Sequence, residues 1–311
     1  MLRPPRPAGA LPLLVAIAAA LTLAPATAGQ DDAAFEIPES WLRPVEPFAV
    51  ADGVYWVGSE ELAAYLLTGD EGHVLIDAPM EQNAERILAS VRALGFDPAD
   101  IEIVLATHGH LELTGAAADV IEASGRELWL LRAAAGQLRA GGRGDFFLGD
   151  RAGYPPARAA RVLADGEEVR LGELRLRALA TPGHTRGCTS WSFRANVDSQ
   201  PVEAVLVCSL SVLPGYRLVG ESASYVGIGS DFCRSLAKLE ALEPELFLSN
   251  HGSFLGLETK RRELQSGVAD AFVDPEGYRD YLRRARLQIE DTLREQGGQG
   301  CSDLLRRPGK P

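Results

Sequence analysis

The sequence predicts an α/β protein in which two β-sheets pack face to face and helices lie on the outside. Runs of short apolar strands followed by a helix-like stretch occur twice along the chain, which favours a layered architecture. The composition, 46% hydrophobic and 24% charged over 311 residues, is that of a globular protein with a sizeable core.

Residues 1–28 have the pattern of a secretory signal peptide. Arg3 and Arg6 precede an apolar stretch from about Leu11 to Ala24, and Ala26-Thr27-Ala28 supplies a small-residue cleavage site. The alternative is a membrane anchor, but the apolar stretch is shorter than the roughly 20 residues that span a bilayer. We therefore expect cleavage near Ala28, a periplasmic or secreted protein, and no membrane contact afterwards.

The charge balance restricts the partners. The net charge is −12, and it becomes −14 once the two arginines of residues 1–28 are removed. Such an acidic chain is a poor partner for nucleic acid or anionic membrane. A small-molecule substrate remains open, and the oligomeric state is not determined by the sequence.

The first half of the sequence predicts five strands and one helix. Apolar runs predict strands at 54–57, 64–67, 74–77, 101–105 and 128–131, with a helix over about 82–94. Residues 142–157 are rich in Gly, Pro and aromatic residues, which predicts an irregular loop over a functional region.

The second half repeats the pattern. A hairpin about Gly172, a second hairpin and a strand at 246–248 accompany helices over 231–242 and about 275–295. We assign residues 29–295 to one domain and residues 296–311 to a C-terminal tail.

The cysteines are interpreted in the light of export to an oxidising compartment. Cys188 and Cys208 lie on strands joined by a turn centred near position 198.5, and they are almost equally distant from that centre. They should face each other on neighbouring strands, so we predict a disulfide between them. The sequence leaves open whether Cys233 and Cys301 pair or stay free.

The segment Thr107-His108-Gly109-His110-Leu111-Glu112-Leu113 is the most informative motif. Two histidines two residues apart, directly after an apolar strand, can turn both imidazoles toward one metal ion. Glu112 adds a carboxylate. Leu113 stands where a further ligand is expected, and its side chain cannot bind a metal.

Two more histidines follow strand-like segments, where ligands gather in layered folds: His184 in TPGHT and His251 in SNHG. Catalytic zinc takes three protein ligands and keeps a position for water, so His108, His110 and His184 suffice for one ion. Zinc can lower the pKa of that water to around 7 and so provide a hydroxide nucleophile. The alternative for a lone His-x-His pair is a surface or structural role.

Two other residues are weaker candidates for a role in the metal site. His73, in a predicted turn, is interpreted as a structural or surface residue. Asp77, at a strand end, is a candidate for a hydrogen bond to a ligand histidine, and the alternative is an ordinary acid in a turn.

The sequence resembles the metallo-β-lactamase superfamily, and specifically its subclass B3, from about Trp41 to Arg286. The resemblance rests on AYLLTGDEGHVLIDAP, ATHGHLELTG, RVLADGEEVRLGELRLRALATPGHTRGCTSWSF, CSLSVLPGYRLVG, LSNHGSF and FVDPEGYRDYL. The His-x-His-x-Asp-His motif of the superfamily indicates only fold and hydrolase chemistry, whereas the TPGHTRGCTSW and SLSV segments point to the subclass.

The resemblance implies an αββα sandwich of two mixed β-sheets, with helices on the outer faces and a metal site at one edge. His108, His110 and His184 match the first zinc site of the family. Glu112 stands in place of an aspartate, and Leu113 in place of the second-site histidine.

His251 matches the other ligand of the family's second zinc site. Ser209 and Ser211 match serines that help to hold the substrate carboxylate. The alternative for the two serines is that they are polar residues at a strand end.

These departures make one zinc ion as serious an expectation as two. Glu112 could reach a second ion together with His251, or it could act on the water bound to a single zinc. The resemblance implies a hydrolase in which zinc-bound hydroxide opens the β-lactam ring of penicillins, cephalosporins and carbapenems. The alternatives are hydrolysis of another substrate, such as a lactone, thioester or amide, and a zinc-binding protein whose second site has decayed.

Overall fold

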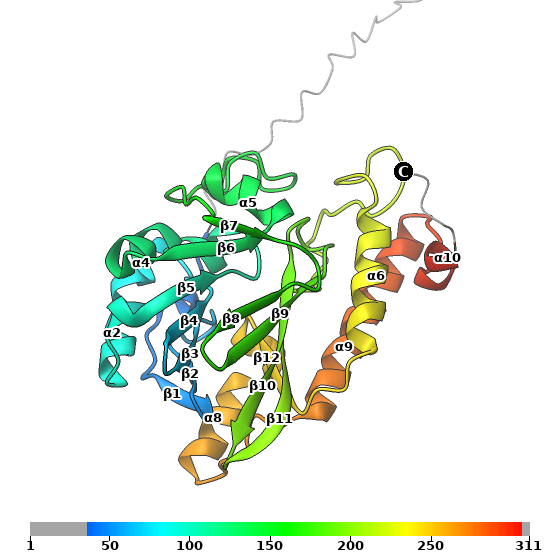
Figure 1. Cartoon of the computed structure of the whole chain (residues 1–311). Coiled ribbons are helices and arrows are strands. Elements are labelled where there is room, and N and C mark those ends of the chain that lie inside the picture. Colours follow the sequence, from blue (N-terminus) through cyan, green and yellow to red (C-terminus); the bar gives the residue numbers. More distant parts are fainter. Residues whose placement is uncertain (1–35, 307–311) are drawn as a thin grey trace, which may run out of the picture. The chain divides into compact units, whose positions relative to one another are not determined.

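Two mixed β-sheets form the centre of the computed structural model, which describes residues 36–306 (Figure 1). In this part of the chain the first sheet has seven strands, in the order β1 (Phe48–Ala51), β2 (Val54–Trp56), β3 (Tyr65–Gly69), β4 (Gly72–Ile76), β5 (Ile101–Leu105), β6 (Glu127–Leu131) and β7 (Arg161–Leu163). Its first four strands pair antiparallel, and β4 to β7 pair parallel.

The second sheet has five strands within the described residues, in the order β12 (Leu246–Ser249), β11 (Gln200–Val207), β10 (Thr189–Val197), β9 (Leu174–Ala180) and β8 (Glu168–Leu171). Only β11 and β12 pair parallel. The predicted strands at 54–57, 64–67, 74–77, 101–105 and 128–131 all correspond to strands of the first sheet, with ends that differ by at most two residues.

Side-chain alternation explains why the first sheet is covered on both faces. Along β4, Val74 and Ile76 join the core that also contains Trp191 and Leu206 of the second sheet. Leu75, which points the other way, joins a separate core with the helices α2 (Ala84–Ala93) and α4 (Ala117–Ser124). These two helices lie beside the outer face of the first sheet in Figure 1.

Helices α6 (Ile228–Glu240) and α9 (Pro275–Glu295) accompany the second sheet (Figure 1). Helix α9 begins where the prediction places it, because Pro275 occupies its first turn and the Asp274 carboxylate accepts a hydrogen bond from the Gly277 N–H. The remaining helices are short: α1 (Glu39–Leu42), α3 (Leu111–Thr114), α5 (Arg132–Arg139), α7 (Gly252–Leu255), α8 (Leu257–Gln265) and α10 (Cys301–Arg306). Two 3-10 turns span Glu81–Asn83 and Pro98–Asp100.

The β10–β11 hairpin confirms the predicted centre of the turn. Its pairs, such as Trp191 with Leu206, are centred on position 198.5. The loop is only Asp198 and Ser199, with φ of 50° and 62°, the left-handed backbone of tight hairpins.

Both cysteine pairs form disulfides, Cys188 with Cys208 as predicted and Cys233 with Cys301. The second bond ties α10, which lies in the predicted C-terminal tail, to α6. The predicted signal peptide lies outside the described residues. Among the described helices, none combines the length and apolar character that crossing a bilayer requires.

Candidate metal centre

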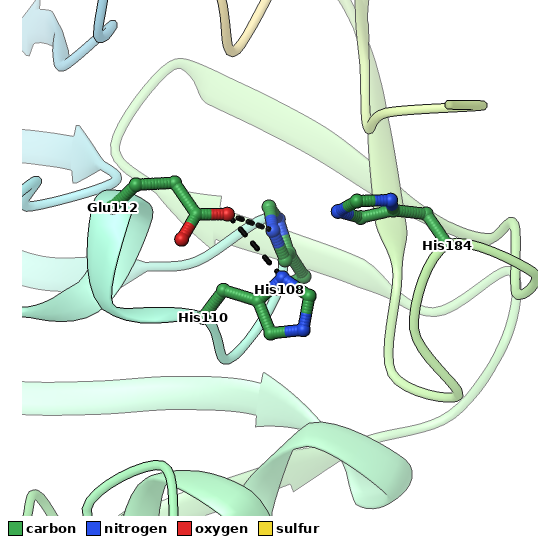
Figure 2. Close-up of side chains that lie close together, drawn as sticks. All are labelled: His108, His110, Glu112 and His184. Carbon is green, nitrogen blue, oxygen red and sulfur yellow. Dashed lines mark hydrogen bonds and ion pairs between the residues drawn. The ribbon is translucent and has the colours of Figure 1, made fainter. Parts of the chain in front are cut away.

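Four of the predicted ligands converge at the carboxyl ends of two strands. His108 and His110 lie in the turn after β5, Glu112 lies on α3, and His184 follows β9. Figure 2 shows the four side chains turned toward one another. Their ligand atoms all lie within 4.8 Å of one another, and all four residues are buried.

The three imidazoles are arranged as neighbouring walls of one small space. The ring centroids are 4.9 Å apart for His108 and His110, 5.0 Å for His108 and His184, and 5.1 Å for His110 and His184. The ring planes are close to perpendicular, at 75° to 81°. Glu112 Oε1 lies 3.1 Å from His108 Nε2 and 3.3 Å from His110 Nδ1, so the carboxylate faces the same space.

A buried network fixes the turn that carries His108. The Asp77 carboxylate accepts hydrogen bonds from the Thr107 N–H, at 2.6 Å, and from the Thr107 hydroxyl, at 2.9 Å. This corrects the prediction for Asp77, which bonds to the residue before a ligand histidine rather than to the histidine. The reason is geometric, because β4 and β5 are neighbouring parallel strands with Ile76 paired to Leu105, so that Asp77 follows β4 beside the turn that carries Thr107.

The second nitrogen of His108 is held by the same network. Thr107 Oγ1 donates to Asp77 and lies 3.3 Å from His108 Nδ1, so it can accept a hydrogen bond from that nitrogen. The lone pair of His108 Nε2 is then left for the space shared with Glu112.

His184 and His110 are oriented in the same manner. His184 Nδ1 lies 3.0 Å from the Ser211 carbonyl, which can only accept, so this nitrogen carries the proton and Nε2 is free. His110 Nε2 lies 3.4 Å from Asp145 Oδ2, and its Nδ1 faces Glu112. Each histidine therefore has one nitrogen that faces the centre. The other nitrogen lies within hydrogen-bond distance of Thr107 in His108 and of Ser211 in His184, and it makes an ion-pair contact with Asp145 in His110.

Asp145 is a site residue that the sequence reasoning missed. It lies in the irregular loop that was predicted to cover a functional region, but nothing in the local sequence separates it from Asp150 in the same loop. Besides approaching His110, its carboxylate accepts hydrogen bonds from the N–H groups of Phe147 and Leu148 and from Gln137 Nε2. Asp145 thus connects the loop to a ligand histidine.

The charges in the centre favour a bound cation. Burial lowers the pKa of His108 to about 4, and it lowers the pKa of His184 well below the usual value, so both rings are neutral at pH 7. Burial alone would also lower the pKa of His110, but the Glu112 and Asp145 carboxylates raise it to about 9. Burial opposes ionisation of Glu112, yet His110 and His108 hold its pKa well below its usual range.

This donor set fits zinc. Three imidazole nitrogens and one carboxylate oxygen surround a buried space, and two carboxylates there already hold a proton on His110. Catalytic zinc takes three such nitrogen ligands and keeps a fourth position for water, and a divalent ion would take the place of that proton, with the Glu112 carboxylate beside it. The neighbouring set of His108, Cys188 and Cys208 is no second candidate, because the two sulfurs are bonded to each other.

His251 lies outside the four-residue cluster. Its Nδ1 is 3.3 Å from Glu61 Oε1, and its ring packs 4.9 Å from that of Phe254. It is near enough for its charge to lower the pKa of His108. Its role as a ligand stays a prediction. His73 is buried edge-on against Phe96, in agreement with a structural role.

The two serines differ in exposure. Ser209 is 1% exposed, and its hydroxyl accepts a hydrogen bond from the Ser211 N–H. This contact stabilises the conformation of the segment after β11. Ser211 lies at the surface of a small cavity and holds His184 through its carbonyl group.

A sandwich of two mixed sheets with outer helices, carrying a buried three-histidine centre at the strand ends, defines a class of metal-dependent hydrolase fold. The family model of the metallo-β-lactamase superfamily matches residues 63–197. A Cronobacter sakazakii metallo-β-lactamase with a HARLDQ motif is 37% identical at a TM-score of 0.80, and the match covers 84% of this chain and 99% of that one. The chain therefore belongs to the metallo-β-lactamase superfamily.

Subclass B3 and related enzymes give similar matches. BJP-1 of Bradyrhizobium japonicum, described as subclass B3, is 31% identical at a TM-score of 0.78, covering 83% of this chain and 97% of its own. FEZ-1 of Legionella gormanii is 31% identical at a TM-score of 0.81, covering 85% of this chain and 100% of its own.

The metal-binding motif varies between these proteins. The HARLDQ motif has arginine third and glutamine sixth, whereas the segment from His108 to Leu113 has Glu112 fifth and leucine sixth. Both lack histidine at the sixth position.

Proposed function

We propose that this chain is a zinc-dependent hydrolase that opens the β-lactam ring of penicillins, cephalosporins and carbapenems. The observation that carries the proposal is the convergence of His108, His110 and His184, each with one nitrogen that faces a common space and the other close to a polar group of the protein. The names of the similar solved proteins support the choice of substrate.

The roles of the chain's own residues follow from the geometry. Zinc, when bound, would polarise the lactam carbonyl and acidify a water molecule. Glu112 Oε1 faces the same space as the inner imidazole nitrogens, so it is placed to accept a proton from the attacking water and return it to the lactam nitrogen. The Ser211 carbonyl keeps His184 in the tautomer that ligand binding requires.

One zinc ion per chain is part of the proposal. Glu112 lies against His108 and His110 rather than apart from them, so its carboxylate belongs to the first site. Leu113 is fully buried in the core beneath α2 and α4, and it fills the position of the second-site histidine with apolar packing.

The test is hydrolysis by purified zinc-loaded protein of one penicillin, one cephalosporin and one carbapenem, with and without a chelator. We expect hydrolysis that the chelator abolishes and that zinc restores, and loss of hydrolysis in His184→Ala. Inactivity on all three compounds, beside an active subclass B3 enzyme in the same assay, would refute the proposal.

The single-ion assignment has its own measurement, the zinc content per chain. We expect one ion in the wild-type protein and additional binding in the double variant Glu112→Asp/Leu113→His. Two tightly bound ions in the wild-type protein would contradict the assignment without affecting the proposed reaction.

The altered second site also supports a second candidate, hydrolysis of a lactone, thioester or other amide. Leu113 is the specific reason, because it removes a ligand from the part of the site where family members bind the leaving nitrogen. A kcat/KM on such substrates far above that on all three β-lactams would select this candidate.

We also propose export to the periplasm after removal of residues 1–28. Cell fractionation with N-terminal sequencing tests this, and the expected N-terminus lies near Gly29. Full-length protein in the cytoplasm would contradict it.

A further inference from the structure

Gly109 is the flexible point of the turn that joins His108 to His110. Before the turn, Thr107 is fixed by its buried hydrogen bonds. After it, the His110 carbonyl accepts a hydrogen bond from the Thr114 hydroxyl at 2.8 Å. Glycine has no side chain that restricts its backbone dihedrals, so rotation of the peptide unit between Gly109 and His110 would change the angle between the two imidazoles.

Tyr154 makes the contact that holds this peptide unit. Its hydroxyl lies 2.6 Å from the Gly109 carbonyl oxygen, and because a carbonyl can only accept, the tyrosine donates. The residue is 5% exposed, and burial raises the pKa of its hydroxyl, which therefore keeps the proton that it donates. A hydrogen bond in such a buried place is stronger than the same bond in water.

The loop after α5 brings the Tyr154 hydroxyl to that carbonyl. The Tyr154 N–H donates to the Gly141 carbonyl at 3.0 Å, and Gly141 and Gly142 have φ of 61° and 74°. A Cβ atom on Gly142 would lie 2.5 Å from Tyr154 Cε1, so the ring occupies space that a side chain would need. On the side of the turn, a Cβ atom on Gly109 would lie 2.7 Å from Gln137 Oε1 of α5. The turn, the helix and the tyrosine are therefore in direct contact.

From these contacts we infer that Tyr154 is a positioning residue of the metal centre, which sets the angle between His108 and His110 by holding the carbonyl between them. The inference rests on the zinc centre of the proposed function. The Tyr154 hydroxyl is occupied by this carbonyl, so the residue acts through the backbone and not on the substrate. Loss of a contact that orients a ligand histidine typically weakens metal binding roughly 10- to 100-fold.

The experiment measures metal binding, which needs no substrate. Tyr154→Phe keeps the ring and removes the hydroxyl, and we expect its dissociation constant for zinc, from competition with a chromophoric chelator, to rise about tenfold. With cobalt in place of zinc, the visible ligand-field absorption should change in position or intensity, because it depends on the ligand geometry. Tyr154→4-aminophenylalanine places a donor at the same position and should recover both the affinity and the spectrum.

The matched control is Tyr278→Phe. The Tyr278 hydroxyl also donates to a backbone carbonyl, that of Leu239 at 2.7 Å, and the residue is 2% exposed, but this bond joins α9 to α6. Both variants should lose similar stability in chemical denaturation, since each loses one buried hydrogen bond of the same kind. Only Tyr154→Phe should alter the zinc affinity and the cobalt spectrum.

Unchanged zinc affinity and cobalt spectrum in Tyr154→Phe, or equal changes in Tyr278→Phe, would overturn the inference. The proposed function fails separately from it. Wild-type protein that binds zinc but hydrolyses no β-lactam would refute the proposed reaction, while a tenfold loss of zinc affinity in Tyr154→Phe would still support the positioning role. Wild-type protein that binds neither ion would refute both.

Discussion

Each imidazole of the metal centre has one nitrogen turned inward and one held by the protein, and the holder differs from histidine to histidine. His108 is held by a threonine hydroxyl, His184 by a backbone carbonyl and His110 by a carboxylate. Of these three partners, only the Asp145 carboxylate carries a charge. It helps to raise the pKa of His110 while the other two rings are made neutral by burial.

We expect Asp145→Ala to weaken zinc binding about 10- to 100-fold, because the variant loses both the partner of His110 Nε2 and the hydrogen bonds that hold the loop. Competition with a chromophoric chelator measures the dissociation constant. Asp150→Ala is the control, since Asp150 bonds to Gly144 in the same loop and does not contact a histidine. Similar affinities in the two variants would show that Asp145 does not orient His110.

Helix α9 links the hydrophobic core to the candidate metal centre. Its apolar residues lie in the core with α6. Its polar side chains Tyr281 and Gln288, together with Gln296 directly after the helix, hold the segment after β11. That segment carries Ser211, whose carbonyl holds His184. A helix that begins far from the metal ligands in sequence therefore decides where one of them points.

We expect Gln288→Leu to lower the free energy of unfolding by about 1–2 kcal/mol, since two hydrogen bonds to Val212 are lost. Activity should fall further than stability alone explains, because Ser211 lies next to Val212. Denaturant titration and kcat/KM are the two measurements. Leu287→Ala changes the adjacent residue, which is 58% exposed, and should alter neither.

The two disulfides act at different places in the molecule. Cys188–Cys208 lies beside the metal centre, with Cys208 Sγ 3.8 Å from His108 Nδ1. Cys233–Cys301 closes a loop of 68 residues and holds the last described helix to α6. The first supports the site, and the second supports the C-terminal part of the described chain.

Replacing both Cys233 and Cys301 by serine should lower the free energy of unfolding by about 4 kcal/mol, the loop-closure entropy for a loop of 68 residues. Chemical denaturation measures this loss, and hydrogen exchange should show faster exchange in α10 while β5 stays protected. Retention of the Cys188–Cys208 bond, checked by mass mapping, is the control. Unchanged stability would mean that α10 contributes nothing to the folded state.

Metal removal should destabilise the whole molecule. Zinc at 1,000 times its dissociation constant contributes about 4 kcal/mol to the free energy of unfolding, so a chelator should lower the melting temperature. His108→Ala should melt at the same temperature with and without chelator. A wild-type protein that is insensitive to the chelator would contradict a buried zinc site.

The fold class, most strands and four converging candidate ligands were predictable from the sequence, because apolar periodicity and polar residues at strand ends are local signals. Even the Cys188–Cys208 pairing followed from counting along one hairpin. The position of Asp145 and the link from Asp77 to Thr107 depend on contacts between segments that are distant in sequence. Only the tertiary structure decides these, because packing of the sheets and of α9 sets which polar groups meet, and no local pattern encodes that meeting.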